Sequence, residues 1–175
     1  MTFRDKFIGA FLLILVALVI AIWLLPAGSD YAPSLQLKTT DGRQISIGAQ
    51  QKGPVLVNFW ATTCRTCMKE IPLLARLYQQ LQPQGLEIVG VSVFYDPPIQ
   101  VMEMVRHKQI PYPIVFDLDK RIQLGFGMKT PVTPATFLFD QHGKIVYKTL
   151  GMPDMVRLEK LIRTLLKQTN TPKEG

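Results

Sequence analysis

The stretch that decides the fold is Val55-Leu56-Val57-Asn58-Phe59-Trp60-Ala61-Thr62-Thr63-Cys64-Arg65-Thr66-Cys67. Its first six residues form a mostly apolar run, which is typical of a buried strand. Two cysteines separated by two residues follow shortly after it, and from there a helical apolar pattern continues to Leu81. The sequence therefore predicts a buried strand, a turn, and a helix that carries a cysteine pair in its first turn.

The segments on either side continue an alternation of strands and helices. Before the buried strand, residues 35–47 are predicted as a hairpin around Asp41-Gly42. After the cysteine helix the predicted elements are a strand, a helix, a short strand, a helical turn, two hairpin strands and a last helix. They lie at residues 86–94, 99–107, 114–116, 119–124, 136–139, 145–149 and after Pro153. This order predicts an α/β fold with a mixed sheet and helices on both faces.

Residues 7–25 are 19 consecutive positions without a charged or strongly polar side chain. A helix of that length reaches about 28 Å, close to the thickness of a bilayer core. Arg4 and Lys6 precede the run, so the N-terminus is expected in the cytoplasm and the remaining chain outside it. A cleaved signal peptide with its cut near Ala27-Gly28-Ser29 is the alternative. Both interpretations export the domain.

The predicted organisation is a membrane anchor or signal peptide at 1–29, a linker at 30–34, a folded domain at 35–168 and a flexible tail at 169–175. A domain of this size buries a full core without needing disulfides to hold it together. The net charge is +7, but the basic residues are scattered, with no run of more than two. This pattern disfavours nucleic-acid binding and favours a basic surface near an anionic membrane or an acidic partner.

Cys64 and Cys67 are the only cysteines in the chain. A zinc site needs four ligands, and no second ligand pair is visible. Covalent haem attachment needs a histidine after the second cysteine, where Met68 stands. A redox dithiol needs only what is present, so no metal and no cofactor is predicted. Unpaired N–H groups and the helix dipole stabilise a thiolate at a helix start, which makes Cys64 the predicted nucleophile and Cys67 the resolving thiol.

These features resemble the thioredoxin superfamily, in particular its exported, membrane-anchored branch of TlpA-, ResA- and CcmG-like proteins. Besides the strand and the cysteine pair, the matching motifs are residues 69–72, 89–93, 133–140 and 143–145, in the family's order over about residues 33–168. The resemblance implies a thioredoxin-like fold with an added N-terminal β-hairpin, preceded by one transmembrane helix. It implies a thiol-disulfide oxidoreductase tethered to the inner membrane of a bacterium, with its domain in the periplasm or extracytoplasmic space.

The resemblance also implies clients and a partner. The clients are exported proteins with disulfides, such as apocytochrome c or copper-site assembly proteins, and a transmembrane donor of the DsbD/CcdA type supplies the electrons. Among the residues, Pro134 matches the family's cis-proline, with Pro131 as a rival for that position, and Thr133 before it faces the sulfurs and holds client peptide.

Glu70 and Asn58 match positions near the thiols in the family. Glu70 would pass protons or tune the pKa of the cysteine pair, whereas the alternative is a solvated charge in the first turns of a helix. Asn58 stands where thioredoxin has a buried acid. Its amide cannot act as a base, and the alternative is that it only bonds nearby backbone.

Two departures from the family leave the redox direction open. Thr63 stands where the family usually has tryptophan, and the dipeptide Arg65-Thr66 lacks the common proline before Cys67. Arg65 adds positive charge beside the thiolate and would make the couple more oxidising. The alternatives are therefore a disulfide oxidase or isomerase, or a metal- or haem-handling chaperone whose dithiol only grips its ligand. Copper chaperones of the Sco type are disfavoured because their cysteines are spaced more widely.

Overall fold

The computed structural model describes residues 14–16, 18, 31–48 and 51–170. Residues 14–16 and 18 are helical, and their apolar side chains are exposed. The rest of the predicted anchor at 7–25 lies outside the described residues. Within the ranges given, none of the helices has both the length and the apolar character that a membrane crossing needs.

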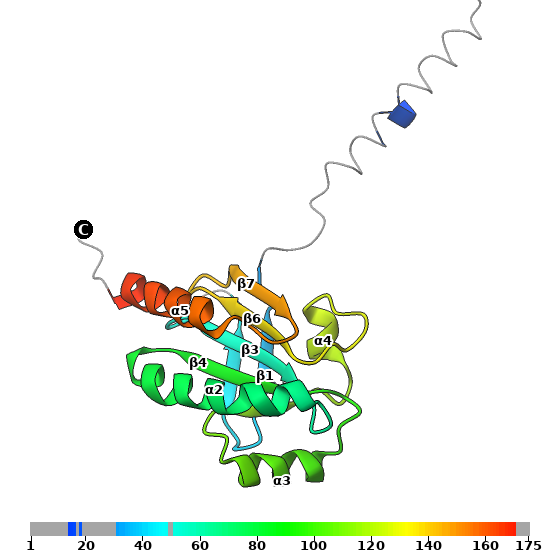
Figure 1. Cartoon of the computed structure of the whole chain (residues 1–175). Coiled ribbons are helices and arrows are strands. Elements are labelled where there is room, and N and C mark those ends of the chain that lie inside the picture. The colour runs from blue at the N-terminus through cyan, green and yellow to red at the C-terminus, as the bar shows by residue number, and fades with distance from the viewer. Residues whose placement is uncertain (1–13, 17, 19–30, 49–50, 171–175) are drawn as a thin grey trace, which may run out of the picture.

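The domain is built on a five-stranded mixed sheet in the order β5-β4-β3-β6-β7, with a separate two-stranded hairpin (Figure 1). In chain order the strands are β1 (Leu35–Lys38), β2 (Gln44–Ile47), β3 (Val55–Trp60), β4 (Glu87–Ser92), β5 (Ile114–Phe116), β6 (Ala135–Phe139) and β7 (Ile145–Leu150). The first three strands of the large sheet, β3, β4 and β5, run parallel, and β6 and β7 are antiparallel to their neighbours.

The helices follow the predicted order. They are α2 (Arg65–Leu81), the 3₁₀ turn η1 (Gln82–Gln84), α3 (Pro98–Lys108), α4 (Arg121–Gly125) and α5 (Met155–Asn170). The thioredoxin-like α/β architecture and its added hairpin are therefore confirmed, with β3 and β5 at the predicted bounds. α5 continues two residues past the predicted domain end at 168, because Leu165 and Leu166 hold its last turns in the core and Thr169 donates to the Leu165 carbonyl.

The core lies on both faces of the sheet. Figure 1 shows α2 and α5 in front of the sheet and β1 behind it. On the α2 face, alternate strand residues such as Leu56 and Trp60 pack with Leu74 of α2 and Ile162 of α5. On the other face, the hairpin and α4 cover the remaining strand residues. All six residues of β3 are buried, because helices or the hairpin cover both of its faces.

Gly90 lies in the centre of the sheet, where β4 pairs with Asn58 of β3 and Ile114 of β5. A Cβ atom at this position would lie 2.6 Å from Ile114 Cδ1, 3.1 Å from Tyr112 Cε2 and 3.2 Å from Trp60 Nε1. The absence of a side chain therefore lets two aromatic side chains converge above this point of the sheet.

We expect Gly90→Ala to lower the free energy of unfolding by about 1–3 kcal/mol, because the new methyl overpacks a closed part of the core. Urea unfolding measures this change. Gly125→Ala is the control, since a Cβ there meets its nearest neighbours at 3.4 and 3.5 Å, and we expect a change within about 0.5 kcal/mol. Equal losses in the two variants would show that the space above Gly90 is not closed.

Candidate active site

The cysteine pair is oxidised and sits at the start of α2. Cys64 is the N-cap residue, with an extended backbone (φ −82°, ψ 104°), and its Sγ accepts the backbone N–H of Cys67 at 3.1 Å. A disulfide of 2.09 Å joins the two sulfurs. Cys64 is half-buried, whereas Cys67 is fully buried. The predicted position of Cys64 at the start of the helix is confirmed, and a backbone donor already points at its sulfur.

Glu70 lies one helical turn after Cys67, and its side chain is 0% exposed. Its Oε1 accepts hydrogen bonds from Asn58 Nδ2 and Thr136 Oγ1, each at 3.0 Å. The alternative of a solvated charge is therefore wrong, because the carboxyl points from α2 onto the sheet.

Burial raises the pKa of Glu70 to about 7, although the hydrogen bonds from Thr136 and Asn58 act in the opposite direction. At neutral pH the carboxyl is thus present in both its neutral and its charged form. A group with that property, one turn from a thiol, has the pKa that suits proton exchange near pH 7.

Asn58 and Thr136 are neighbours across β3 and β6 and share the face that α2 covers. Asn58 Nδ2 also lies 3.1 Å from Thr136 Oγ1, so the three polar side chains form one buried cluster. The interpretation of Asn58 as a residue that only bonds nearby backbone is therefore wrong. The sequence analysis did not predict Thr136 as a site residue. Its position as the second residue of the strand that follows Pro134 could have indicated it.

The peptide bond between Thr133 and Pro134 is cis, as predicted, and Pro131 is not a cis residue. Since β6 begins at Ala135 and runs antiparallel to β3, Pro134 lies at the end of the sheet where β3 leads into α2. Within the described residues, no hydrogen bond involves the backbone of Thr133. Arg65, the other predicted site residue, is exposed in the first turn of α2.

Asp96 holds the loop that leads to Cys64. This carboxylate is only 2% exposed and accepts the backbone N–H of Thr62 at 2.6 Å and the Thr62 hydroxyl at 2.5 Å. The contact ties the turn after β3 to the turn after β4. Sequence reasoning missed this residue, although its place after the carboxyl end of a neighbouring parallel strand was a signal.

In the described part of the chain, no group of three or more His, Cys, Asp or Glu side chains is placed to hold a metal ion.

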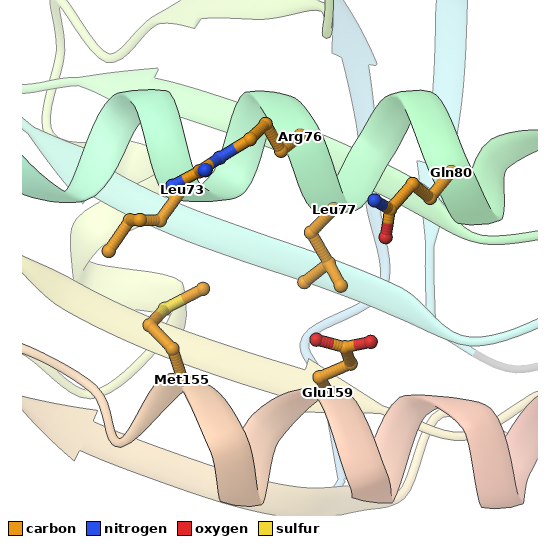
Figure 2. A pocket seen from close by; sticks show the side chains of 6 residues that line it. All are labelled: Leu73, Arg76, Leu77, Gln80, Met155 and Glu159. Atoms are coloured by element: carbon orange, nitrogen blue, oxygen red, sulfur yellow. The ribbon is translucent and has the colours of Figure 1, made fainter.

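A surface groove of about 240 Å³ lies between α2 and α5 (Figure 2). Its first lining residue on α2 is Leu73, more than two turns beyond Cys64, so the groove is separate from the cysteine pair.

Comparisons with known proteins agree with this geometry. The chain matches the AhpC/TSA family over residues 29–148. It is 35% identical to the thiol-disulfide oxidoreductase ResA of Bacillus subtilis over 124 residues, which cover 71% of this chain and 67% of that protein. ResA of Geobacillus thermodenitrificans is 32% identical over 65% of this chain, and the chain spans 64% of its length. The thioredoxin domain of a thiol-disulfide oxidoreductase from Bacteroides vulgatus is 27% identical with a TM-score of 0.65, covering 79% of this chain and 99% of that domain.

The raised pKa of Glu70 makes the stability of the oxidised protein depend on pH. The folded state keeps the proton up to about pH 7, whereas the unfolded chain releases it near 4.5. The folded state therefore binds more protons between these values, and stability falls as the pH rises through this window. We expect a loss of roughly 3 kcal/mol between pH 4.5 and 7.5.

The glutamine side chain in Glu70→Gln cannot ionise, so this variant is expected to lose much less stability between pH 4.5 and 7.5. Urea unfolding at several pH values, with the disulfide intact, measures it. Glu103→Gln, which changes an exposed carboxyl on α3, should keep the dependence. A Glu70→Gln protein with the original pH dependence would mean that Glu70 is not the group responsible.

Proposed function

The chain belongs to the AhpC/TSA family and is a thiol-disulfide oxidoreductase, and we propose that it is an exported, membrane-tethered reductase of disulfides in other exported proteins. One observation carries the proposal. A cysteine pair at a helix N-cap is followed, one turn later, by a buried carboxyl with a pKa of about 7. A structural disulfide has no need of a titratable group at that place.

The reaction begins from the dithiol. The Cys64 thiolate attacks one sulfur of the client disulfide, that S–S bond breaks, and the released client thiolate takes a proton. The Cys67 thiolate then attacks Cys64 Sγ in the mixed disulfide and releases the second client thiol. The client gains two electrons and two protons, and the pair ends in the disulfide form described above.

Cys67 needs a proton acceptor before it attacks, because it is fully buried. Side chains three residues apart on a helix lie on the same face, about 5–6 Å apart at Cβ. Glu70 stands in that relation to Cys67 and, with a pKa of about 7, is a carboxylate in a large share of molecules at neutral pH. We assign it the role of taking the Cys67 proton during the resolving step.

The client is held beside the sulfurs at the cis-proline. Thr133 and Pro134 come directly before the first residue of β6, at the end of the sheet where the cysteine turn lies. The Thr133 backbone has no hydrogen-bond partner within the described residues. An extended client segment can pair with that backbone in the manner of an added strand. Arg65 is exposed next to Cys64 and would stabilise its thiolate, weakly because salt screens exposed charges.

Export and tethering rest on the apolar run at 7–25 and its basic flank. A supporting observation is that residues 14–16 and 18 of this run are helical and exposed. A domain held outside the inner membrane of a bacterium has no direct access to cytoplasmic reductants. A transmembrane donor of the DsbD/CcdA type would therefore reduce the pair, and apocytochrome c or copper-site assembly proteins are the proposed clients.

The reduction potential of the Cys64–Cys67 couple tests the direction. We expect a value near that of thioredoxin, about −270 mV, by equilibration with glutathione or dithiothreitol at pH 7. A value near about −120 mV, as in DsbA, would contradict the reductase and indicate an oxidant.

Insulin reduction with matched serine variants tests the roles of the two thiols. Cys67→Ser is expected to accumulate a mixed disulfide through Cys64, whereas Cys64→Ser should form none and both should lose turnover. Turnover that survives both substitutions would exclude the enzymatic role of the pair.

A further inference from the structure

A group of buried polar atoms between α2 and the sheet has no hydrogen-bond partner within the described residues. The group includes Glu70 Oε2, Trp60 Nε1, Tyr112 Oη and Asn58 Oδ1. A buried donor or acceptor left unpaired costs about 1–3 kcal/mol. Several such atoms in one place indicate a shared partner rather than separate defects.

These atoms lie on one face of the sheet. Leu56 and Trp60 belong to the α2-side core, and because strand side chains alternate, Asn58 between them points to the same side. Thr136, Asn58, Gly90 and Ile114 are aligned across β6, β3, β4 and β5. Glu70 reaches this row from above through its bonds to Asn58 and Thr136.

Three side chains converge at the point where Gly90 lacks a Cβ atom. The position of that absent Cβ lies 2.6 Å from Ile114 Cδ1, 3.1 Å from Tyr112 Cε2 and 3.2 Å from Trp60 Nε1, so the Ile114 methyl fills this point and the two aromatic side chains lie beside it. Trp60 is 0% exposed and Tyr112 is 3% exposed, so bulk water does not reach them. The Tyr112 ring packs edge-on against Tyr78, with centroids 6.1 Å apart, and its hydroxyl oxygen is itself buried.

We propose that Tyr112 and Trp60 are positioning residues for Glu70, and that Trp60 Nε1, Tyr112 Oη and Glu70 Oε2 share one internal water molecule as their missing hydrogen-bond partner. One indole N–H donor, one phenol and one carboxylate oxygen supply the two to four hydrogen bonds that a buried water requires. This inference rests on the proposed role of Glu70 in exchanging a proton with Cys67. It adds the residues that complete the hydrogen bonding of the carboxyl on the side away from Asn58 and Thr136.

The electrostatics agree with this arrangement. Burial raises the pKa of Tyr112 above its ordinary value, and the charge of Glu70 raises it further, which indicates that the phenol and the carboxyl are close. The groups that face Glu70 are Asn58 of β3, Thr136 of β6, Cys67 of α2 and Tyr112 ahead of β5. Within the described residues, no charged side chain contributes to the pKa of Glu70.

The test follows the Glu70 carboxyl directly in the full chain, kept oxidised so that the thiols do not titrate. The protein has five glutamates, so labelling glutamate with ¹³C at Cδ gives a small set of carboxyl NMR signals. The signal that is missing in Glu70→Gln is that of Glu70. We expect a midpoint near 7 for the unchanged protein. Tyr112→Phe removes one partner of the water and should move the midpoint upward by about one pH unit.

Tyr78→Phe is the matched control, because it removes the same hydroxyl from the adjacent ring. The Tyr78 phenol interacts with Arg43 and Glu87, so this variant should move the Glu87 signal and leave Glu70 in place. A Glu70 midpoint that is unchanged in Tyr112→Phe, or moved equally by Tyr78→Phe, would overturn the proposal.

A second measurement needs no change near the site. The chain has two tryptophans, and Trp23→Phe assigns their indole signals in ¹⁵N-labelled protein. The Trp60 N–H should show a cross-peak to a long-lived bound water, and its absence would also overturn the proposal.

Alkylation of the reduced protein by iodoacetamide, as a function of pH, separates this inference from the function on which it rests. Glu70→Gln should change the pH profile, and Tyr112→Phe should change it only when Glu70 is present. An unaltered profile in Glu70→Gln would exclude the proton-exchange role of Glu70, whereas the carboxyl midpoint would still decide whether Tyr112 acts on it.

Discussion

A carboxyl buried between a helix and a sheet is the constraint on which the rest of the structure depends. Glu70 is 0% exposed and is held by Asn58 and Thr136 from two different strands. A buried carboxyl is tolerated only where donors reach it. These bonds therefore require α2, β3 and β6 to be in one relative position, and a shift of either strand by one residue would turn its polar side chain to the opposite face.

The same row of residues links this constraint to the cysteines. The register that pairs Asn58 with Thr136 also places the residues before β6 at the end of β3, where the chain turns into α2. Asp96, from the turn after β4, fixes the turn at Thr62. The carboxyl, the cis-proline and the cysteine pair thus depend on one sheet register.

Local features of the fold could be predicted from the sequence, and contacts between distant segments could not. β3 and β5 have their predicted bounds, because short apolar runs between polar or proline-containing segments define a buried strand well. The N-cap position of Cys64 was predictable for a similar reason. The partners of Asn58 were not, since Glu70 is 12 residues away and Thr136 is 78 residues away, and periodicity carries no information on which polar side chains meet. The contact between Asp96 and Thr62, 34 residues apart, was missed for the same reason.

The burial of Glu70 disfavours its charged form and thereby gives the carboxyl a pKa that suits proton exchange. Reduction of a disulfide to a dithiol takes up two electrons and two protons. Because Cys67 is fully buried, its sulfur cannot exchange a proton with solvent directly. A carboxyl at its ordinary pKa would stay charged at neutral pH and would hold a thiol proton poorly. Desolvation moves the pKa of Glu70 to about 7, and the bonds from Asn58 and Thr136 keep it from rising further. The polar cluster therefore balances two opposing effects, and that balance leaves the group next to the resolving thiol able both to accept and to return a proton.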